Sequence, residues 1–357
     1  MTEEWKYPID VCCRSNSSKQ CPIKLHEIYC DGYLEEQKIG AISHFHADHI
    51  GTIADCLRHY DIMITHPTTL RAIGGIDSGW PRLEQWVAMD YDTKFKTNSS
   101  EIRLLKANHI PGSAQIHVVT NGETLLYSGD FNYPFAPTRE ADYLVLDATH
   151  GDPSVDGKTD RKSVLSRMYE DVKEKIDSKK SVVINTDTGT LQEIIRHFEI
   201  GYDGNEPKLS HDIPFVAKKN QIKIFKEIYK EEKEEFREIL EFGEREFWTK
   251  VHGKNKPCVI FLVDRIIDED LENHYKIITG RYQFRQDKPP IIYHEDTNSA
   301  HYNLASHASI DNVLKYVEDV KAKVVITDGS RSEQAKHLAR QIELKFDHIR
   351  VFTRGIR

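Results

Sequence analysis

Three histidines and one aspartate stand within six positions, in the stretch His44-Phe45-His46-Ala47-Asp48-His49. Just before it, Ala41-Ile42-Ser43 predicts the end of a short buried strand. Because side chains alternate along an extended backbone, His44 and His46 should point to the same side. The alternative is a polar loop that is rich in histidine by chance, but the spacing H-x-H-x-D-H is too specific to favour it.

Asp48 and His49 follow at the point where the chain turns, and residues 50–54 predict a helix. Two pairs of ligand-type side chains therefore converge, one from a strand end and one from the loop after it. Neutral imidazoles and a carboxylate suit zinc, and also manganese or iron. The motif predicts a metal site in this part of the chain.

The motif resembles that of the metallo-β-lactamase superfamily of two-metal hydrolases. The resemblance implies a further histidine before a glycine-containing turn and an aspartate that ends another strand. His109 in Asn108–Ala114 and Asp130 in Leu125–Asn132 supply them. Either residue alone would more often be an ordinary loop residue, but their order along the chain favours ligands. The resemblance implies one metal on His44, His46 and His109, a second on Asp48, His49 and a later histidine, and Asp130 between them.

The last part of the chain narrows the resemblance to the β-CASP nucleases, which insert a second domain before the C-terminal strands. Asp147 in Leu146–Gly151 looks like the acidic motif of that group, and His307 in Leu304–Ile310 looks like its late metal-binding histidine. His301 competes with His307, but a helix and a strand follow His307 at the spacing of the family. His150 and His294 are more typical of surface or pocket histidines.

Two divalent metal ions would account for the chemistry that this ligand set implies. Ions about 3.5–4 Å apart can share a hydroxide, lower its pKa and clamp phosphate oxygens during in-line attack. Zn²⁺ is the favoured metal, with Mn²⁺ or Mg²⁺ as alternatives. In this interpretation Asp48, Asp130 and His307 are catalytic residues as well as metal ligands.

Within the β-CASP group the chain looks most like the DNA cross-link-repair nucleases and Artemis, and it is also similar to small ligase-associated exonucleases. The motifs that carry this similarity are Cys21-Pro22-Ile23, Ile28–Asp31, Ser43–His49, Ala107–Gly112 and Ser128–Phe131, with Gly112–Gln115 for the exonucleases. At the final motif the RNA-processing members carry a histidine and the DNA-processing members a valine, whereas this chain has Asp328. Three roles are open for Asp328: an outer partner of His307, a substrate contact, or a turn residue, which we favour.

Substrate phosphates need hydroxyl groups and arginines near the metals, because a guanidinium can bind phosphate through two hydrogen bonds. Lone arginines are more often solvated or paired, so each of these assignments is a hypothesis. The candidate substrate-binding residues are Ser113, Asp147, Thr149, Asp328, Ser330 and Arg331, with Arg281 and Arg285 in the insertion.

The composition is that of a globular protein, with 39% hydrophobic and 30% charged residues among 357. No apolar run reaches the roughly 18 residues of a membrane span, and the acidic N-terminus does not resemble a secretory signal. We therefore expect a cytoplasmic protein, or a nuclear one in a eukaryote, without membrane partners and with reduced cysteines. A structural zinc site on Cys12, Cys13, Cys21 and Cys30 is less favoured, since no C-x-x-C pair is present. The net charge of −8 argues only mildly against nucleic-acid binding, because local patches decide it.

The expected fold is a metallo-β-lactamase αββα sandwich, of class α/β, with an inserted β-CASP α/β domain. Residues 1–152 form the first part of the sandwich, 153–292 the insertion and 293–357 the C-terminal part. Strands are expected at 25–29, 61–65, 101–105, 143–146, 181–186, 257–263 and 323–327. The highly charged segment 218–250 predicts one or two amphipathic helices.

Together the motifs predict a metal-dependent nuclease that hydrolyses phosphodiester bonds through a metal-bridging hydroxide. A DNA 5′-exonuclease or structure-specific repair nuclease is favoured over an RNA-processing enzyme, so DNA is the expected partner. A metallohydrolase of lactones, thioesters or cyclic nucleotides is the second hypothesis, although it leaves the long insertion unexplained. A non-catalytic scaffold is the third, and the complete ligand set argues against it.

Overall fold

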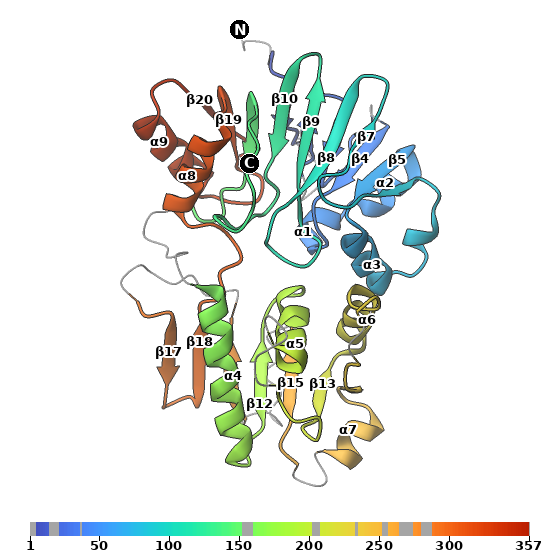
Figure 1. Cartoon of the computed structure of the whole chain (residues 1–357), viewed down its shortest axis with the longest axis vertical. Coiled ribbons are helices and arrows are strands. Elements are labelled where there is room, and N and C mark those ends of the chain that lie inside the picture. The colour runs from blue at the N-terminus through green and yellow to red at the C-terminus, as the bar shows by residue number, and fades with distance from the viewer. Residues whose placement is uncertain are drawn as a thin grey trace. The chain divides into compact units, whose positions relative to one another are not determined.

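The computed structural model describes residues 5–13, 21–35, 38–151, 160–201, 208–232, 235–251, 256–263, 274–279 and 288–356. The chain forms two compact units (Figure 1). The first unit comprises Met1–Val155 and Ser306–Arg357, and the second comprises Asp156–Ala305. The insertion therefore ends at residue 305 and not at 292, because the strands at 291–294 and 299–302 pair with the sheet of the second unit.

The first unit begins with a six-stranded sheet. Its strands, in spatial order, are β1 (Ile9–Val11), β2 (Ile23–Leu25), β3 (Ile28–Cys30), β4 (Ile39–Ile42), β5 (Ile62–Thr65) and β6 (Trp86–Ala88). The first three are antiparallel neighbours, and β3 to β6 are parallel. The single strand expected at 25–29 is wrong, because His26 takes a φ of 55° and the chain reverses there into a hairpin.

A second, seven-stranded sheet contains strands from both ends of the chain. Its spatial order is β20 (Arg350–Arg354), β19 (Val324–Asp328), β11 (Tyr143–Leu146), β10 (Glu123–Tyr127), β9 (Ala114–Thr120), β8 (Ser100–Lys106) and β7 (Phe95–Lys96). Because β11 pairs in parallel with β19, the strands before and after the second unit are adjacent. This pairing brings the C-terminal segment beside the early motifs.

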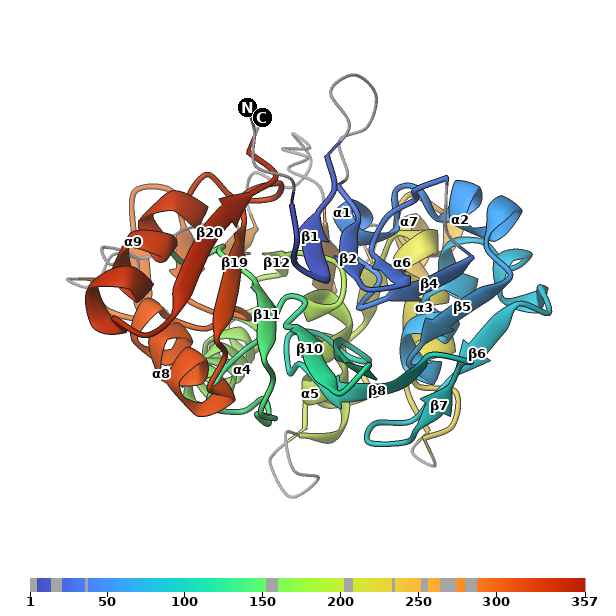
Figure 2. The ribbon, with the colours of Figure 1, turned by 90° about the horizontal axis from the view of Figure 1, so that it is seen from above.

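The two sheets enclose one apolar core, and helices cover their outer faces. Along β10, Leu125 joins the core between the sheets, while Leu126 packs with the helices α8 (Ile310–Val320) and α9 (Ala335–Lys345). Figure 2 shows these helices beside β19 and β20, and it shows α2 (Ile53–His59) and α3 (Pro67–Ile76) beside β4 and β5. The αββα sandwich expected from the sequence is confirmed. The remaining helical segments of this unit are α1 (Ala47–Ile50) and a 3₁₀ turn (Trp80–Arg82).

The second unit is a mostly parallel α/β layer structure. Its strand order is β14 (Ile239–Glu241), β13 (Phe215–Ala217), β15 (Val259–Leu262), β12 (Val182–Asn185), β16 (Tyr275–Ile278), β18 (Ser299–Tyr302) and β17 (Ile291–His294), with β17 antiparallel to β18. Side chains of β12 alternate between two cores: Val182 and Ile184 pack with α4 (Arg161–Asp177), α5 (Thr190–Ile200) and α6 (Lys219–Ile228), and Val183 packs with α7 (Arg245–Lys250).

The charged segment 218–250 is only partly helical. It contains α6 and α7 as expected, but Ile239 and Leu240 lie in strand β14 between them. Two adjacent apolar residues match a buried strand as well as a helix, so the pattern did not separate the two.

The cysteines differ from the expectation of reduced thiols at one place. Cys13 and Cys21 form a disulfide, whereas Cys12, Cys30, Cys56 and Cys258 are free. The pairing of two early cysteines also removes them from the less favoured structural zinc site. Within the described residues, no helix is both long and apolar enough to cross a bilayer.

Candidate metal centre

Three turns place the first group of ligand-type side chains. His44 and His46 follow β4, where the backbone stays extended up to residue 46, and His109 lies in the loop between β8 and β9. That loop turns at Gly112, whose φ is +81°, and an added Cβ would lie 2.7 Å from the backbone nitrogen of Thr69. The positive φ and the close approach both require glycine.

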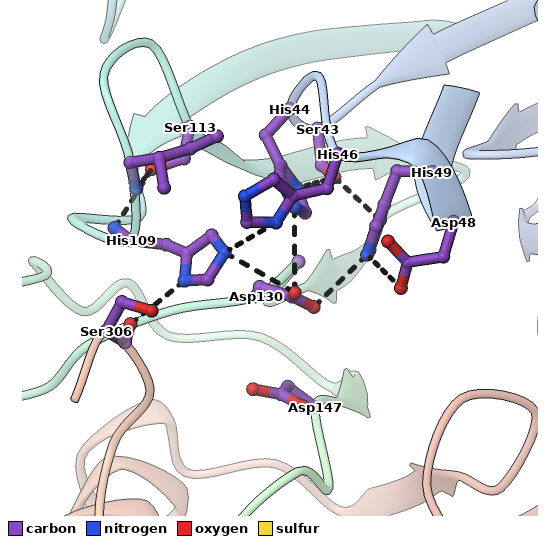
Figure 3. A network of polar contacts seen from close by, with 12 residues as sticks. Ser43, His44, His46, Asp48, His49, His109, Ser113, Asp130, Asp147 and Ser306 are labelled. Atoms are coloured by element: carbon purple, nitrogen blue, oxygen red, sulfur yellow. Dashed lines mark hydrogen bonds and ion pairs between the residues drawn. The ribbon is translucent and has the colours of Figure 1, made fainter. Parts of the chain in front are cut away.

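Asp130 enters the same space from the end of β10. The preceding Gly129 has a φ of +53°, and a Cβ there would lie 2.8 Å from the carbonyl oxygen of Ala114. Nitrogen or oxygen atoms of His44, His46, His109 and Asp130 all lie within 4.8 Å of one another (Figure 3). The structure thus brings together the four residues that the sequence assigns to the first metal and the bridging position.

The two oxygens of Asp130 face different histidines. Oδ2 lies 3.6 Å from Nε2 of His44 and 3.6 Å from Nε2 of His109. Oδ1 lies 3.4 Å from Nε2 of His49, which is also 3.4 Å from Oδ2 of Asp48. Figure 3 shows Asp130 between the two sets. Its carboxylate therefore has the geometry of a group shared by two ion sites.

A second ligand-type group consists of Asp130, Asp147 and His307. Nε2 of His307 lies 3.8 Å from Oδ2 of Asp130, and its Nδ1 lies 2.7 Å from Oδ2 of Asp147. The ring of His150 lies beside His307, with 5.5 Å between the ring centroids. His307, and not His301, therefore reaches the centre within the first unit.

His301 and its neighbour His294 are placed in the second unit. Nε2 of His294 lies 2.9 Å from Nδ1 of His301, where β17 pairs with β18. Neither histidine belongs to a group of ligand-type side chains among the described residues.

Asp31 is a residue of this centre that sequence analysis did not assign to it. Its carboxylate is fully buried and accepts hydrogen bonds from the backbone N–H of Ser43 at 2.7 Å and from its hydroxyl at 2.6 Å. It also lies 2.8 Å from Nδ1 of His49 and accepts a hydrogen bond from the Tyr127 hydroxyl at 3.0 Å. A carboxylate on the far nitrogen of a ligand histidine fixes its tautomer and ring orientation. The available signal was an aspartate that ends a buried strand, as Asp130 does.

Burial keeps two histidines neutral. It lowers the pKa of His44 well below its usual value, and the nearby His49 adds to the effect. Burial likewise lowers the pKa of His109, and the nearby His307 adds to it. Both rings are uncharged near neutral pH, and an uncharged imidazole nitrogen is the form that binds a metal.

Carboxylates have the opposite effect on His49 and His307. Burial acts against the charge on His49, yet Asp130 and Asp31 raise its pKa well above the usual value. Burial also acts against the charge on His307, but Asp147 raises its pKa to about 9. Since a ligand histidine must be deprotonated, a metal that binds here displaces protons.

The residues present fit divalent metal ions. Nε2 of His44 and Nε2 of His49 are buried without a hydrogen-bond partner, although both lie near a carboxylate oxygen of Asp130. Buried polar atoms are rarely left unpaired unless an ion or water completes them. Atoms each about 2.1 Å from one tetrahedral ion lie roughly 3.4 Å apart, close to the separations around Asp130. Nitrogen and carboxylate donors suit Zn²⁺ and Mn²⁺.

The structure gives other roles to two predicted substrate contacts. Ser113 is 1% exposed, and its hydroxyl accepts hydrogen bonds from the backbone of His109 and Ile110, so it supports the His109 loop. The Thr149 hydroxyl donates to Asp147 at 2.7 Å and so fixes the carboxylate that meets His307. Both residues lie near the centre but use their hydroxyl groups internally.

The final-motif residues form a compact group of their own. The carboxylate of Asp328 accepts hydrogen bonds from Ser330 and forms an ion pair with Arg331 at 2.8 Å. None of these three residues belongs to the groups of potential metal ligands. The turn geometry favoured for Asp328 is present. Arg281 and Arg285 lie outside the described residues.

Comparison with known proteins agrees with this geometry. Residues 41–184 match the family model of the metallo-beta-lactamase superfamily. This chain carries a metallo-β-lactamase domain. It is similar to a crystal structure of a protein of unknown function from Enterococcus faecalis, with a TM-score of 0.52 and 11% identity over 84% of this chain and 77% of that one. That likeness supports the fold alone.

Three curated relatives match parts of this chain. An RNase J-like protein of Methanocaldococcus jannaschii is 29% identical over 43% of this chain and 41% of its own. The DNA cross-link repair protein SNM1 of Arabidopsis thaliana is 26% identical over 31% and 24%. An uncharacterized protein from the lig 3′ region of Acidianus ambivalens is 35% identical over 19% and 51%. The chain spans about half the length of these relatives or less, and two of their names agree with the β-CASP nuclease branch.

Proposed function

We propose that this protein is a metal-dependent nuclease that hydrolyses phosphodiester bonds at the centre around Asp130. One observation carries the proposal: Asp130 lies among His44, His46 and His109 and is also 3.4 Å from His49 and 3.8 Å from His307, in a chain whose residues 41–184 match the metallo-beta-lactamase superfamily. Two relatives with names of nuclease families, an RNase J-like protein and SNM1, support the same reaction class. Such an enzyme would act in the cytoplasm, or in the nucleus of a eukaryote.

In this proposal His44, His46 and His109 would hold one divalent ion, Asp48, His49 and His307 would hold a second, and Asp130 would contribute to both sites. Divalent ions bound there would supply a hydroxide at neutral pH and neutralise the phosphate charge. The chain's own residues prepare the site. Asp31 holds Nδ1 of His49 and Asp147 holds Nδ1 of His307, so both rings present Nε2 to Asp130.

DNA is the favoured substrate, with stepwise attack from a 5′ end. RNA-processing β-CASP enzymes carry a histidine at the final motif, whereas Asp328 here is buried and bound to Ser330 and Arg331. Asp328 therefore supplies no additional metal ligand, just as the valine of the DNA-processing branch supplies none. RNA is the second candidate, because the RNase J-like relative aligns with 43% of the chain.

A cleavage assay with metal-quantified protein tests the proposal. The substrates are matched 5′-phosphorylated single strands of DNA and RNA, each labelled at one end. Asp48→Asn is the inactive variant, since Asp48 lies 3.4 Å from His49. Asp55→Asn is its matched control, because that aspartate is exposed and paired only with Arg58 among the interactions described.

Stepwise shortening of DNA from the 5′ end, lost in Asp48→Asn and kept in Asp55→Asn, would support the full proposal. Cleavage of RNA alone would replace the substrate and keep the reaction. Undiminished cleavage by Asp48→Asn would contradict the proposed centre. Two bound metals without cleavage of either polymer would instead favour a metallohydrolase of small molecules.

A further inference from the structure

Arg331 lies in the turn after β19 and hydrogen-bonds to Asp31, a residue of the metal centre that lies 300 positions earlier in the sequence. Its Nη1 donates to Oδ2 of Asp328 at 2.8 Å, and its Nη2 donates to the main-chain oxygen of Asp31 at 3.2 Å. The side chain of Arg331 is 12% exposed and that of Asp328 is 5% exposed. Because the pair is buried, Asp328 orients the guanidinium of Arg331, which has little contact with solvent.

The residue that Arg331 holds is in an uncommon backbone conformation. Asp31 has a φ of +53°, in the left-handed region, which aspartate tolerates better than most residues other than glycine but which still costs free energy relative to ordinary backbone conformations. Its backbone N–H donates to the carbonyl oxygen of Ala41 at 3.0 Å, and its own carbonyl accepts from Arg331. Both ends of the left-handed residue are therefore held.

This conformation matters because of where the Asp31 carboxylate points. Oδ2 lies 2.8 Å from Nδ1 of His49, and Nε2 of the same ring lies 3.4 Å from Asp130. A change of φ at Asp31 would move its carboxylate relative to His49. The hydrogen bond from Arg331 to the main-chain oxygen of Asp31 therefore adds to the contacts from Ser43 and Tyr127 that hold this residue in place.

We propose that Arg331 is a positioning residue of the metal centre, which holds the Asp31 carbonyl and so keeps His49 oriented, and that Asp328 serves to aim Arg331. The inference rests on the proposed function only for its effect on cleavage. Its effect on metal binding is independent of the substrate. It also gives Asp328 a role that neither a histidine nor a valine at that position could fill.

The test compares Zn²⁺ affinity, free energy of unfolding and cleavage in the full chain. Arg331→Met removes both hydrogen bonds while keeping the length of the side chain, and Asp328→Val with Arg331→Met removes both charges. Arg58→Met is the control, because Arg58 and Asp55 form an exposed ion pair with the same spacing of three residues. Affinity is measured with Zn²⁺ alone against a chromophoric chelator.

We expect Arg331→Met to bind Zn²⁺ at least about 10-fold more weakly, the lower end of what loss of an outer partner costs. The double variant should regain stability, because no unpaired charge remains buried, but should keep the weak Zn²⁺ binding. Arg58→Met should match the unchanged protein. Cleavage by Arg331→Met should recover at high Zn²⁺ with an unchanged KM, because a residue that only positions His49 affects metal binding and not substrate binding.

Two results would overturn the inference. One is wild-type Zn²⁺ affinity in Arg331→Met, and the other is recovery of affinity in the double variant, which would mean that the pair only balances charge. If Arg331→Met does not fold, Arg331→Lys decides: one ammonium cannot reproduce the guanidinium fork, so we expect a loss of about threefold or more. A wild type that binds Zn²⁺ but cleaves no nucleic acid would refute the proposed function and leave this comparison valid.

Discussion

The two units bury polar side chains in opposite ways. In the first unit, Nε2 of His44 and Nε2 of His49 are buried without hydrogen-bond partners and lie around Asp130. In the second unit, Arg237 forms an ion pair with Glu199, and its remaining N–H groups donate to main-chain carbonyls. Burial of charge is common to both, so burial alone does not mark a functional site.

What differs is the chemical balance of each group. In the second unit, Asp171 accepts from the hydroxyl of Tyr293 at 2.6 Å and from that of Tyr302, and it forms an ion pair with Arg167. In the first unit, ring nitrogens of His44, His49 and His109 gather around the carboxylate of Asp130, an arrangement that a divalent cation would complete. Among the described residues, every group of three or more potential metal ligands lies in the first unit.

The largest expected effect comes from removing the shared carboxylate. Asp130→Ala should lose both metals and all cleavage, a greater loss than the roughly 10–100-fold that an outer partner costs. The fold should persist, because Asp130 lies in the loop after β10 and belongs to neither apolar core of this unit. Metal content, activity and circular dichroism check this. Retention of both metals would show that the two groups are independent.

The next largest effect is expected from removing a buried cation, instead of a carboxylate, in the second unit. Arg237→Met leaves the buried Glu199 with only His211, 3.6 Å away, which should lower the free energy of unfolding of that unit by about 3–5 kcal/mol. Zn²⁺ affinity of the first unit should not change. Denaturant unfolding followed by hydrogen exchange can assign the loss to its unit. A matching fall in Zn²⁺ affinity would contradict the division of roles between the units.

A smaller effect is expected from the partner of His49. Asp31→Asn keeps the shape and the tolerance for a left-handed backbone but weakens the acceptor at Nδ1 of His49. Zn²⁺ affinity should fall by about 10–100-fold. Competition with a chelator measures the change, with Asp61→Asn, an exposed aspartate, as control. If Asp31→Asn bound Zn²⁺ as tightly as the unchanged protein, His49 would not depend on the Asp31 carboxylate for metal binding.

The smallest effect concerns a buried histidine of the first unit that is no ligand. Burial lowers the pKa of His117 to about 4, and Arg139 adds to the effect. The unfolded chain then binds a proton between that pH and about 6.5 that the folded chain does not, so stability rises with pH in this window and is lost as pH falls. His117→Leu should remove up to about 1.4 kcal/mol of the change in unfolding free energy between pH 5 and pH 6. An unchanged pH slope in His117→Leu would contradict the lowered pKa.

Local alternation along a strand end was enough to predict that His44 and His46 point to the same side. His109, Asp130 and the αββα sandwich were instead predicted from the resemblance of the motif to the metallo-β-lactamase superfamily. The alternating strands and helices of the sequence only agreed with that sandwich. The assignment of residues to individual metals stays a prediction.

Tertiary contacts explain what the sequence could not show. The substrate-binding role of Arg331 stays a prediction, but its hydrogen bond to Asp31, which lies 300 residues earlier in the chain, was not foreseen. The hairpin at His26 was missed because no glycine, proline or asparagine marks the turn. Such features depend on how distant segments meet, and no local pattern encodes that meeting.

The insertion of the second unit between Asp130 and His307 also sets an order in time. His44, His46, His109 and Asp130 are all synthesised by residue 130, whereas His307 follows 177 residues later. At about 5–20 residues per second, that interval is roughly 9–35 s. A nascent chain therefore contains all four side chains of one group long before the group with His307 is complete. If the proposed two-ion site is correct, a first ion could bind during synthesis, and the second would wait until the whole second unit is made.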